Sequence, residues 1–418
     1  MITAPSVSPS SQAASRLCAH VGWGPIFCAL WLVGCVNEIG DEPVPELGFI
    51  ASQEESPLGA RSVPFRAGTE GYNCFRTPAI VKANNGDLLA FAGGRKGGCG
   101  DDTDADVVLR RSTDQGRSWK PMQVIDKGAG DATNRAGLPN PVVLEDGRVL
   151  VVYLWSRFVD GEEDRGCRRV YVKHSDDDGR TWSARRNITA QAQRPCREDD
   201  DGRWIDPPAQ GEWGWTGLGP VHGIVKTKAP HAGRVLIAAR HVAPDSKTYS
   251  HVIYSDDDGE TWKIGGSLDL RSTESTVVEL ANGDIMLNAR SRDEVGHRTV
   301  GISKDGGKTF EPAYVDDELP EPRGVQGSLL RYDNKILFSN PHHRADRTNG
   351  TIQVSHDNGR TWEQKFRYTP EGEFSSYSDM VRVKGDVGVL AEWGPSLDNK
   401  DKHREIRFIV VRKEDLGL

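Results

Sequence analysis

An eight-residue pattern, Ser-x-Asp-x-Gly-x-x-Trp or Phe, occurs five times in the chain and constrains its fold more than any other feature. The copies begin at Ser112, Ser175, Ser255, Ser303 and Ser355. Ser and Asp side chains can bond to nearby backbone, Gly permits a positive φ, and the closing aromatic can pack on a core. We therefore interpret these Asp boxes as structural turns, not as catalytic or metal-binding loops.

A second repeat sets the number of units. Tight turns recur at Gly86, Gly147, Gly233, Gly283, Asn334 and Gly385, at intervals of 61, 86, 50, 51 and 51 residues. Each of the first five is followed by an Asp box, which gives a unit of four antiparallel strands, as in a propeller blade. The sequence predicts an all-β fold, a six-bladed β-propeller of four-stranded blades over residues 62–418. Because the sixth unit lacks a box, we expect a strand near Ser62–Arg66 to complete it.

The N-terminal segment has a different composition. Residues 21–33 are apolar but too short to span a bilayer, which predicts a signal peptide over residues 1–34. The sequence Leu-Val-Gly-Cys at 32–35 resembles the lipobox of bacterial lipoproteins, which implies lipidation of Cys35 and a flexible tether over residues 35–61. We expect an exported protein, lipid-anchored at a bacterial outer membrane or cell surface; an ordinary secretory signal, with a secreted or periplasmic product, is the alternative.

Export makes disulfides possible, and four cysteines fall in the repeat region. We expect the pairs Cys74–Cys99 and Cys167–Cys196, although four cysteines allow three pairings. No Cys/His spacing resembles a zinc site, and a net charge of −8 argues against a nucleic-acid partner. The long interval contains an insertion at residues 190–215, which we interpret either as a rim over one face or as a plain surface loop.

Unusual polar residues gather at one predicted end of the blades. The tight turns and Asp boxes lie at one end, so the start of each first strand and the end of each second strand lie at the other. That opposite end would carry Arg76, Arg95, Asp101, Glu274, Arg290, Arg347, Tyr377 and Glu392. Several arginines converging with acids and a tyrosine indicate a site for a carboxylate or another anion. We interpret Arg292 and Arg298 as solvated surface charges.

With five Asp boxes behind it, the segment YNCFRTP at residues 72–78 resembles the FRIP motif of the exo-α-sialidases (neuraminidases), with Thr77 in place of Ile. The resemblance extends from about Phe65 to Val411. It implies that Arg76, Arg290 and Arg347 form the triad that grips the sialic acid carboxylate, with Arg344 as an alternative third member. Arg95 would also bind substrate, and Glu392 would hold Arg76 in place.

The same resemblance assigns the chemistry. Tyr377 would be the nucleophile, Glu274 the base that activates it, and Asp101 the acid/base, with Asp102 and Asp104 as alternatives. His222 would form part of the pocket wall. A neutral tyrosine avoids the repulsion that a carboxylate nucleophile would feel from the substrate's own carboxylate.

These residues together imply an exo-α-sialidase that hydrolyses terminal α-linked sialic acid, with retention, through a glycosyl-tyrosine intermediate. Its partners would be sialylated glycans of glycoproteins, gangliosides and oligosaccharides. We expect a monomer that needs no metal or organic cofactor. The alternatives are a trans-sialidase, a hydrolase of a related 2-keto sugar acid, or a non-catalytic glycan-binding propeller.

Overall fold

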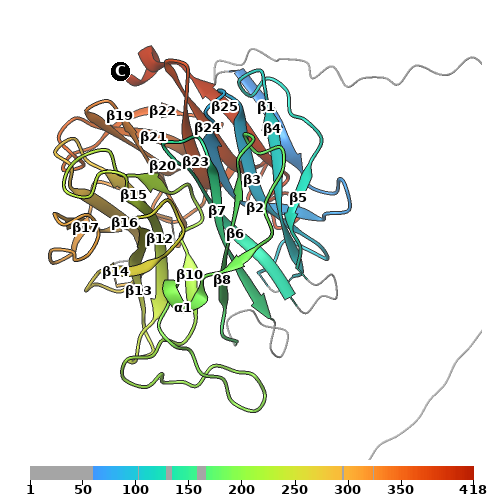
Figure 1. The fold of residues 1–418 in the computed structure, drawn as a ribbon. Helices are drawn as coiled ribbons and strands as arrows, with labels where there is room; N and C mark the ends of the chain where they lie inside the picture. The colour runs from blue at the N-terminus through green and yellow to red at the C-terminus, as the bar shows by residue number, and fades with distance from the viewer. Residues whose placement is uncertain (1–59, 102, 129–133, 158–165, 294–295, 323) are drawn as a thin grey trace, which may run out of the picture. The chain divides into compact units, whose positions relative to one another are not determined.

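Short antiparallel strands joined by tight turns make up most of the regular structure (Figure 1). This computed structural model describes residues 60–101, 103–128, 134–157, 166–293, 296–322 and 324–418. The chain divides into two units, residues 1–50 and 51–418, and all described residues belong to the second. The predicted signal peptide and Cys35 therefore lie outside the described residues, as does the predicted tether apart from its last two residues.

The described strands pair into five sheets. One sheet joins both ends of the described chain and contains β1 (Ala60–Arg66), β25 (Glu405–Val411), β24 (Asp386–Gly394) and β23 (Phe374–Val383). A second four-stranded sheet contains β15 (Ser272–Glu279), β16 (Ile285–Ser291), β17 (Arg298–Ser303) and β18 (Tyr314–Asp316). A third contains β19 (Ser328–Tyr332), β20 (Lys335–Pro341), β21 (Gly350–Ser355) and β22 (Glu363–Arg367).

The other two sheets are larger. One has five strands, β10 (Thr216–Leu218), β11 (Ile224–Val225), β12 (Val235–Val242), β13 (Thr248–Ser255) and β14 (Lys263–Ser267). The other has eight, β2 (Cys74–Lys82), β3 (Leu88–Arg95), β4 (Ala105–Ser112), β5 (Gln123–Asp126), β6 (Asn134–Val143), β7 (Val149–Arg157), β8 (Arg169–Ser175) and β9 (Arg186–Asn187). Two short helices, α1 (Thr189–Ala192) and the 3-10 helix η2 (Lys413–Leu416), complete the regular structure of the described residues.

The prediction of six four-stranded blades is wrong, although the all-β propeller fold is correct. Only three of the five sheets have four strands. The first two sequence units share one sheet because β4 and β6 approach in parallel and pair at Ala105 and Arg135. In the five-stranded sheet, two short segments, β10 and β11, pair with different parts of β12 where one continuous strand was expected.

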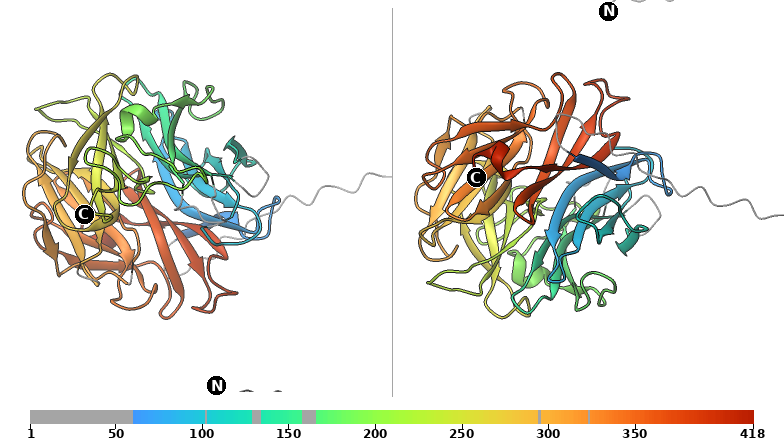
Figure 2. Two further views of the ribbon diagram at one scale, coloured as in Figure 1. Left: turned by 90° about the horizontal axis from the view of Figure 1, so that it is seen from below. Right: turned by 90° about the horizontal axis from the view of Figure 1, so that it is seen from above.

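The closure of the ring is as predicted. Strand β1 pairs antiparallel with β25, so the first described strand joins the sheet built by the last ones. In Figure 2 the blue start of the described chain lies beside the red C-terminal strands, and the sheets follow one another around a common centre. Among the described residues, no helix has the length and apolar character needed to cross a membrane.

All five Asp boxes fold in the same way and act as structural turns. In each box the Ser hydroxyl donates to the Asp carboxylate and accepts from the Gly N–H, at 2.7–2.8 Å and 2.7–2.9 Å. The closing aromatics pack in five different hydrophobic clusters, through Trp119, Trp182, Trp262, Phe310 and Trp362. The boxes therefore tie each turn to an apolar cluster, and most of these clusters join two sheets, as where Trp119 packs on Phe408 of β25.

Candidate active site

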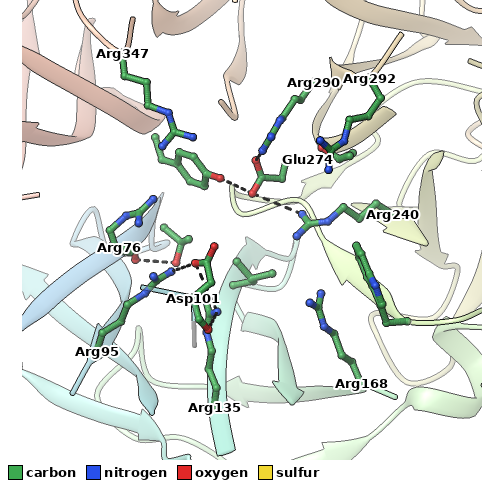
Figure 3. Close-up of a pocket in the computed structure, with 15 residues that line it drawn as sticks. Arg76, Arg95, Asp101, Arg135, Arg168, Arg240, Glu274, Arg290, Arg292 and Arg347 are labelled. Carbon is green, nitrogen blue, oxygen red and sulfur yellow. Dashed lines mark hydrogen bonds and ion pairs between the residues drawn. The ribbon is translucent and has the colours of Figure 1, made fainter. Parts of the chain in front are cut away.

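A cavity of about 540 Å³ lies among the residues that the sequence placed at one end of the strands (Figure 3). Its described lining is strongly cationic and consists of Arg76, Thr77, Arg95, Asp101, Arg135, Leu138, Arg168, Trp215, Arg240, Thr273, Glu274, Arg290, Arg292, Arg347 and Tyr377. No residue of an Asp box is among these lining residues. The Asp-box turns therefore lie at one end of the strands, and the polar groups of the cavity lie at the other.

β-Bulges aim side chains into this cavity. The register of β2 against β3 shifts after Arg76, that of β6 after Gly137, that of β15 after Ser272 and that of β23 after Ser375. Each shift lies beside lining residues, including Arg76, Glu274 and Tyr377. Thr77 has a φ of 55°, which is unfavourable for a β-branched residue and is held by a hydrogen bond from its N–H to Glu392. Such bulges redirect side chains next to functional sites.

Tyr377 and Glu274 form the closest pair in the cavity. The tyrosine hydroxyl donates to Glu274 Oε1 at 2.5 Å, and only 6% of Tyr377 and 7% of Glu274 are exposed. Burial, and then the charge of Glu274, raise the pKa of Tyr377 well above its usual value. Burial would raise the pKa of Glu274 as well, but Arg240 and Arg290 lower it below its usual value. The pair therefore holds a neutral phenol against an ionised carboxylate.

Three arginines surround this pair. The guanidiniums of Arg76 and Arg347 lie 5.4 and 5.6 Å from the centre of the Tyr377 ring, and Arg290 bonds to Glu274 at 3.2 Å. Figure 3 shows that they approach from different elements around the cavity. Three guanidiniums directed at one space form a site for a planar anion such as a carboxylate.

Neighbouring groups fix these arginines in place. Arg76 Nε pairs at 2.9 Å with Glu392, which has no exposed surface and does not line the cavity. Arg347 donates to the carbonyl of Gly324 at 2.5 Å. Gly324 has a φ of 73°, and a Cβ there would lie 2.0 Å from the Arg290 guanidinium. A side chain here would displace the Arg290 guanidinium, and the positive φ also favours glycine between these two arginines.

Arg347, and not Arg344, is the arginine in the cavity. Arg344 bonds to the carbonyls of Gly296 and Asp317, at 3.2 and 3.0 Å, and is not among the described lining residues. The geometry of the site therefore favours Arg347 over Arg344, the alternative that the sequence left open.

Asp101 stands at the mouth of the cavity. Its carboxylate pairs with Arg95 at 2.8 Å, and 77% of its side chain is exposed. Partial enclosure would raise its pKa, but the charges of Arg95, Arg135 and Arg76 lower it well below the usual range. Asp104 is buried, pairs with Lys96 and does not line the cavity, whereas Asp102 lies outside the described residues. Among the described candidates, the geometry favours Asp101.

Both expected disulfides are present, and one of them supports the Asp101 loop. Cys74 is bonded to Cys99 and Cys167 to Cys196. The carbonyl of Cys99 accepts hydrogen bonds from Arg95 at 2.5 Å and from Arg76 at 3.4 Å. The bond to Cys74 therefore ties the loop before Asp101 to the strand that carries Arg76.

Two expectations, for His222 and Arg298, need correction. His222 is absent from the described lining of this cavity and bonds instead to Asp379 at 2.7 Å. Arg298, expected to be solvated, is fully buried and pairs with Glu321 at 2.9 Å. Arg292 is exposed as expected but also lines the cavity. A buried arginine needs a partner for its charge. The sequence alone does not show which carboxylate folding brings to Arg298.

Sequence reasoning missed several lining residues. Arg135, Arg168, Arg240 and Trp215 were not singled out, although all four line the cavity. Trp215 is the last residue of the insertion, which supports its interpretation as a rim. Arg240 follows its turn marker Gly233 by seven residues, the same spacing as Arg290 after Gly283, so the repeat contained the signal.

Comparisons with known proteins identify the family of the chain. The family model described as BNR repeat-like domain matches residues 86–389, and the chain belongs to that family. It is 29% identical to a sialidase of Micromonospora viridifaciens over 93% of this chain and 59% of that protein. It is also 29% identical to a sialidase of Bacteroides fragilis over 78% of this chain and 61% of that protein. These values support the resemblance to bacterial exo-α-sialidases.

The chain spans about three fifths of the length of these two curated relatives. Among solved structures, it resembles the Hadza microbial sialidase Hz136 with a TM-score of 0.70 and 26% identity, over 84% of this chain and 68% of that one. The all-β propeller is therefore shared with sialidases.

Proposed function

We propose that this chain is a retaining exo-α-sialidase that releases terminal α-linked sialic acid from glycans. One observation carries the proposal above all others, the 2.5 Å hydrogen bond from Tyr377 to an ionised Glu274. Arg76, Arg290 and Arg347 surround that pair and form a site for the substrate's carboxylate. A glycan-binding module has no need of a buried tyrosine held against a base.

In the first step, the Tyr377 oxygen attacks the anomeric carbon while Glu274 accepts the phenolic proton. The glycosidic C–O bond breaks, and Asp101 donates a proton to the departing oxygen. In the second step, water attacks the anomeric carbon, Asp101 takes a proton from that water, and the bond to Tyr377 breaks. Glu274 returns its proton to Tyr377. Two displacements at one carbon give net retention.

The free structure holds Asp101 in the ionised form, which cannot donate a proton. The substrate brings a carboxylate into the arginine triad, and this negative charge offsets part of the field that lowers the pKa of Asp101. Binding of substrate thus favours the protonated acid that the first step needs. The substrate's own charge prepares the leaving-group acid.

Proton NMR of an aryl α-sialoside incubated with the full chain tests the proposal. The α-anomer of free sialic acid should appear first and then relax to the β-anomer, as retention requires. The β-anomer as first product would contradict the tyrosine route. A transferred glycoside or an anhydro sugar would assign a transferase, and absence of turnover would refute hydrolysis.

We also retain the prediction that the chain is exported and lipidated at Cys35. Metabolic labelling with an alkyne-bearing fatty acid should label the natural chain, and Cys35→Ser should lose that label. A label that survives the substitution would refute lipidation at this residue.

A further inference from the structure

The cavity holds more positive charge than one carboxylate group requires. Its described lining contains eight arginines and two carboxylates, Asp101 and Glu274. Three of the arginines form the proposed triad, and Arg95 pairs with Asp101. The remaining four arginines have no assigned role in the proposed reaction. Guanidiniums so close together repel each other unless an anion lies between them.

Arg292 is the clearest of these additional charges. Among the described residues, no carboxylate lies within 4.0 Å of its guanidinium, in contrast to Arg290 two residues earlier. Partial burial and the charges of Arg290 and Arg240 lower the pKa of Arg292. The side chain therefore stands in a positive field and lacks a described counter-ion of its own.

Arg240 is the second of these additional charges, and neighbouring groups hold its side chain in place. Its guanidinium lies 5.7 Å from the centre of the Trp215 ring and donates to the carbonyl of Leu218 at 3.1 Å. Its nearest described carboxylate oxygen is Glu274 Oε1 at 3.8 Å, the same atom that accepts the Tyr377 hydroxyl at 2.5 Å. Glu274 is thus mainly committed to Tyr377, and Arg240 retains donors for another partner.

The two arginines lie on the same side of the cavity. In Figure 3, Arg240 and Arg292 lie on one side of Glu274, and Arg76 and Arg347 lie on the other. A sugar whose carboxylate is held by the triad would thus leave the guanidiniums of Arg240 and Arg292 available to a separate group. Arginine binds planar or tetrahedral oxyanions through paired N–H donors.

We propose that Arg240 and Arg292 form a second anion site, which selects sialosides bearing a further negatively charged group. This inference rests on the proposed function, because it takes the triad as the site of the first carboxylate. The shared chemistry is an oxyanion, either a sulfate ester on the sialic acid itself or the carboxylate of a second sialic acid in the aglycone. Arg240 and Arg292 would then determine specificity, and neither would exchange a proton or form a bond with the substrate.

Calorimetry on the full chain carrying Tyr377→Phe tests this with most turnover removed. Three ligands share one aryl group, an α-sialoside, its sulfate ester on the glycerol side chain, and the α2,8-linked disialoside. A charged hydrogen-bonded contact predicts that one doubly charged ligand binds about tenfold or more tightly than the singly charged one. A gain for the sulfate ester places the group on the sugar, and a gain for the disialoside places it in the aglycone.

Arg292→Gln should remove most of that gain. Arg271→Gln is the matched control, because Arg271 is a nearby arginine that pairs with Asp293 and is not among the described lining residues. It removes the same charge from the neighbourhood and should preserve the gain. The second anion site would be overturned by equal affinity for all three ligands or by no binding at all. It would also be overturned if Arg292→Gln weakened all three ligands equally, or if Arg292→Gln and Arg271→Gln had the same effect.

A separate measurement tests the proposed hydrolase activity independently of the second anion site. Turnover of the singly charged aryl α-sialoside by the unsubstituted chain tests hydrolysis alone. Turnover without any preference in binding would remove the second site and leave the sialidase. Binding preference without turnover would support the second site and remove the hydrolase.

Discussion

Replacing Glu274 by Gln should turn the reaction into one limited by the ionisation of tyrosine. The structure places the Tyr377 hydroxyl 2.5 Å from Glu274 Oε1, so the carboxylate is positioned to take the phenolic proton. Without that base, attack depends on the tyrosinate fraction. A pKa of about 10 gives roughly one part in a thousand at pH 7. Burial raises the pKa of Tyr377 further. We expect kcat to fall by about a thousandfold or more.

The assay is kcat for an activated aryl α-sialoside from pH 6 to pH 9. In Glu274→Gln, kcat should rise with pH as the tyrosinate fraction grows, whereas the unsubstituted chain should show no such rise. Tyr377→Phe should abolish most turnover, and adding Glu274→Gln to it should cost little more, because the two residues act as one unit. Glu279→Gln is the control, since Glu279 lies on the same strand, β15, but is not among the described lining residues.

Three results would refute this reasoning. A Glu274→Gln variant that keeps more than about a tenth of kcat would show that Glu274 is not the base, since general base catalysis typically contributes at least about a hundredfold. A pH-independent residual rate would exclude tyrosinate as the attacking species. Losses that multiply in the double variant would show that the two side chains act independently.

Four further predictions follow from the same contacts. Asp101→Ala should slow poor leaving groups more than activated aryl ones, measured by comparing kcat/KM for both; equal losses would remove Asp101 as the acid. Arg95→Gln removes the leading cation that opposes the effect of burial on Asp101, so the pKa of Asp101 should rise and the alkaline limb of kcat/KM should move to higher pH; an unmoved limb would contradict the pairing. Trp262→Ala, at a side chain only 3% exposed, should lower the free energy of unfolding by about 3–5 kcal/mol in denaturant titration, with normal kcat in the folded fraction. Glu321→Leu leaves buried Arg298 without its carboxylate and should destabilise by about 3–5 kcal/mol at pH 8, and adding Arg298→Met should recover much of that loss; no recovery would show that the pair is not coupled.

The Asp boxes illustrate what the sequence could predict. Each box is a local hydrogen-bonded turn, so its Ser, Asp and Gly identify it without knowledge of distant contacts. The regular spacing of the tight turns then located Tyr377, Glu274 and Arg76 on one end of the strands. These residues do line one cavity. Repeats are informative because one interpretation is tested several times along the same chain.

The sheet count could not be predicted from the same repeat. Whether two neighbouring units form separate sheets depends on one contact, the pairing of Ala105 with Arg135. No turn residue or hydrophobic alternation marks such a contact. The extra strand in the five-stranded sheet likewise depends on how β10 and β11 each meet β12.

The sequence also could not predict which charged side chains are buried. Arg298 and Arg292 are both arginines near the ends of strands, and no sequence pattern distinguishes the buried one from the exposed one. The structure buries Arg298 beside Glu321, 23 positions further along the chain, and leaves Arg292 exposed at the cavity. Which charge is buried depends on a partner that folding brings close, so pairwise contacts and not composition decide it.

The charges of the cavity act as one system. Glu274 is kept ionised by Arg240 and Arg290 against the effect of burial, and this lets it accept a proton from a phenol. Asp101 is kept ionised by a neighbouring set of arginines, although the proposed reaction first requires it to donate a proton. An anionic substrate resolves this opposition, because its carboxylate enters among the arginines and weakens the field at Asp101. A neutral sugar of the same shape would leave Asp101 without its proton. Under the proposed mechanism, the cavity would therefore select against neutral glycosides twice, once in binding and once in the protonation of its acid.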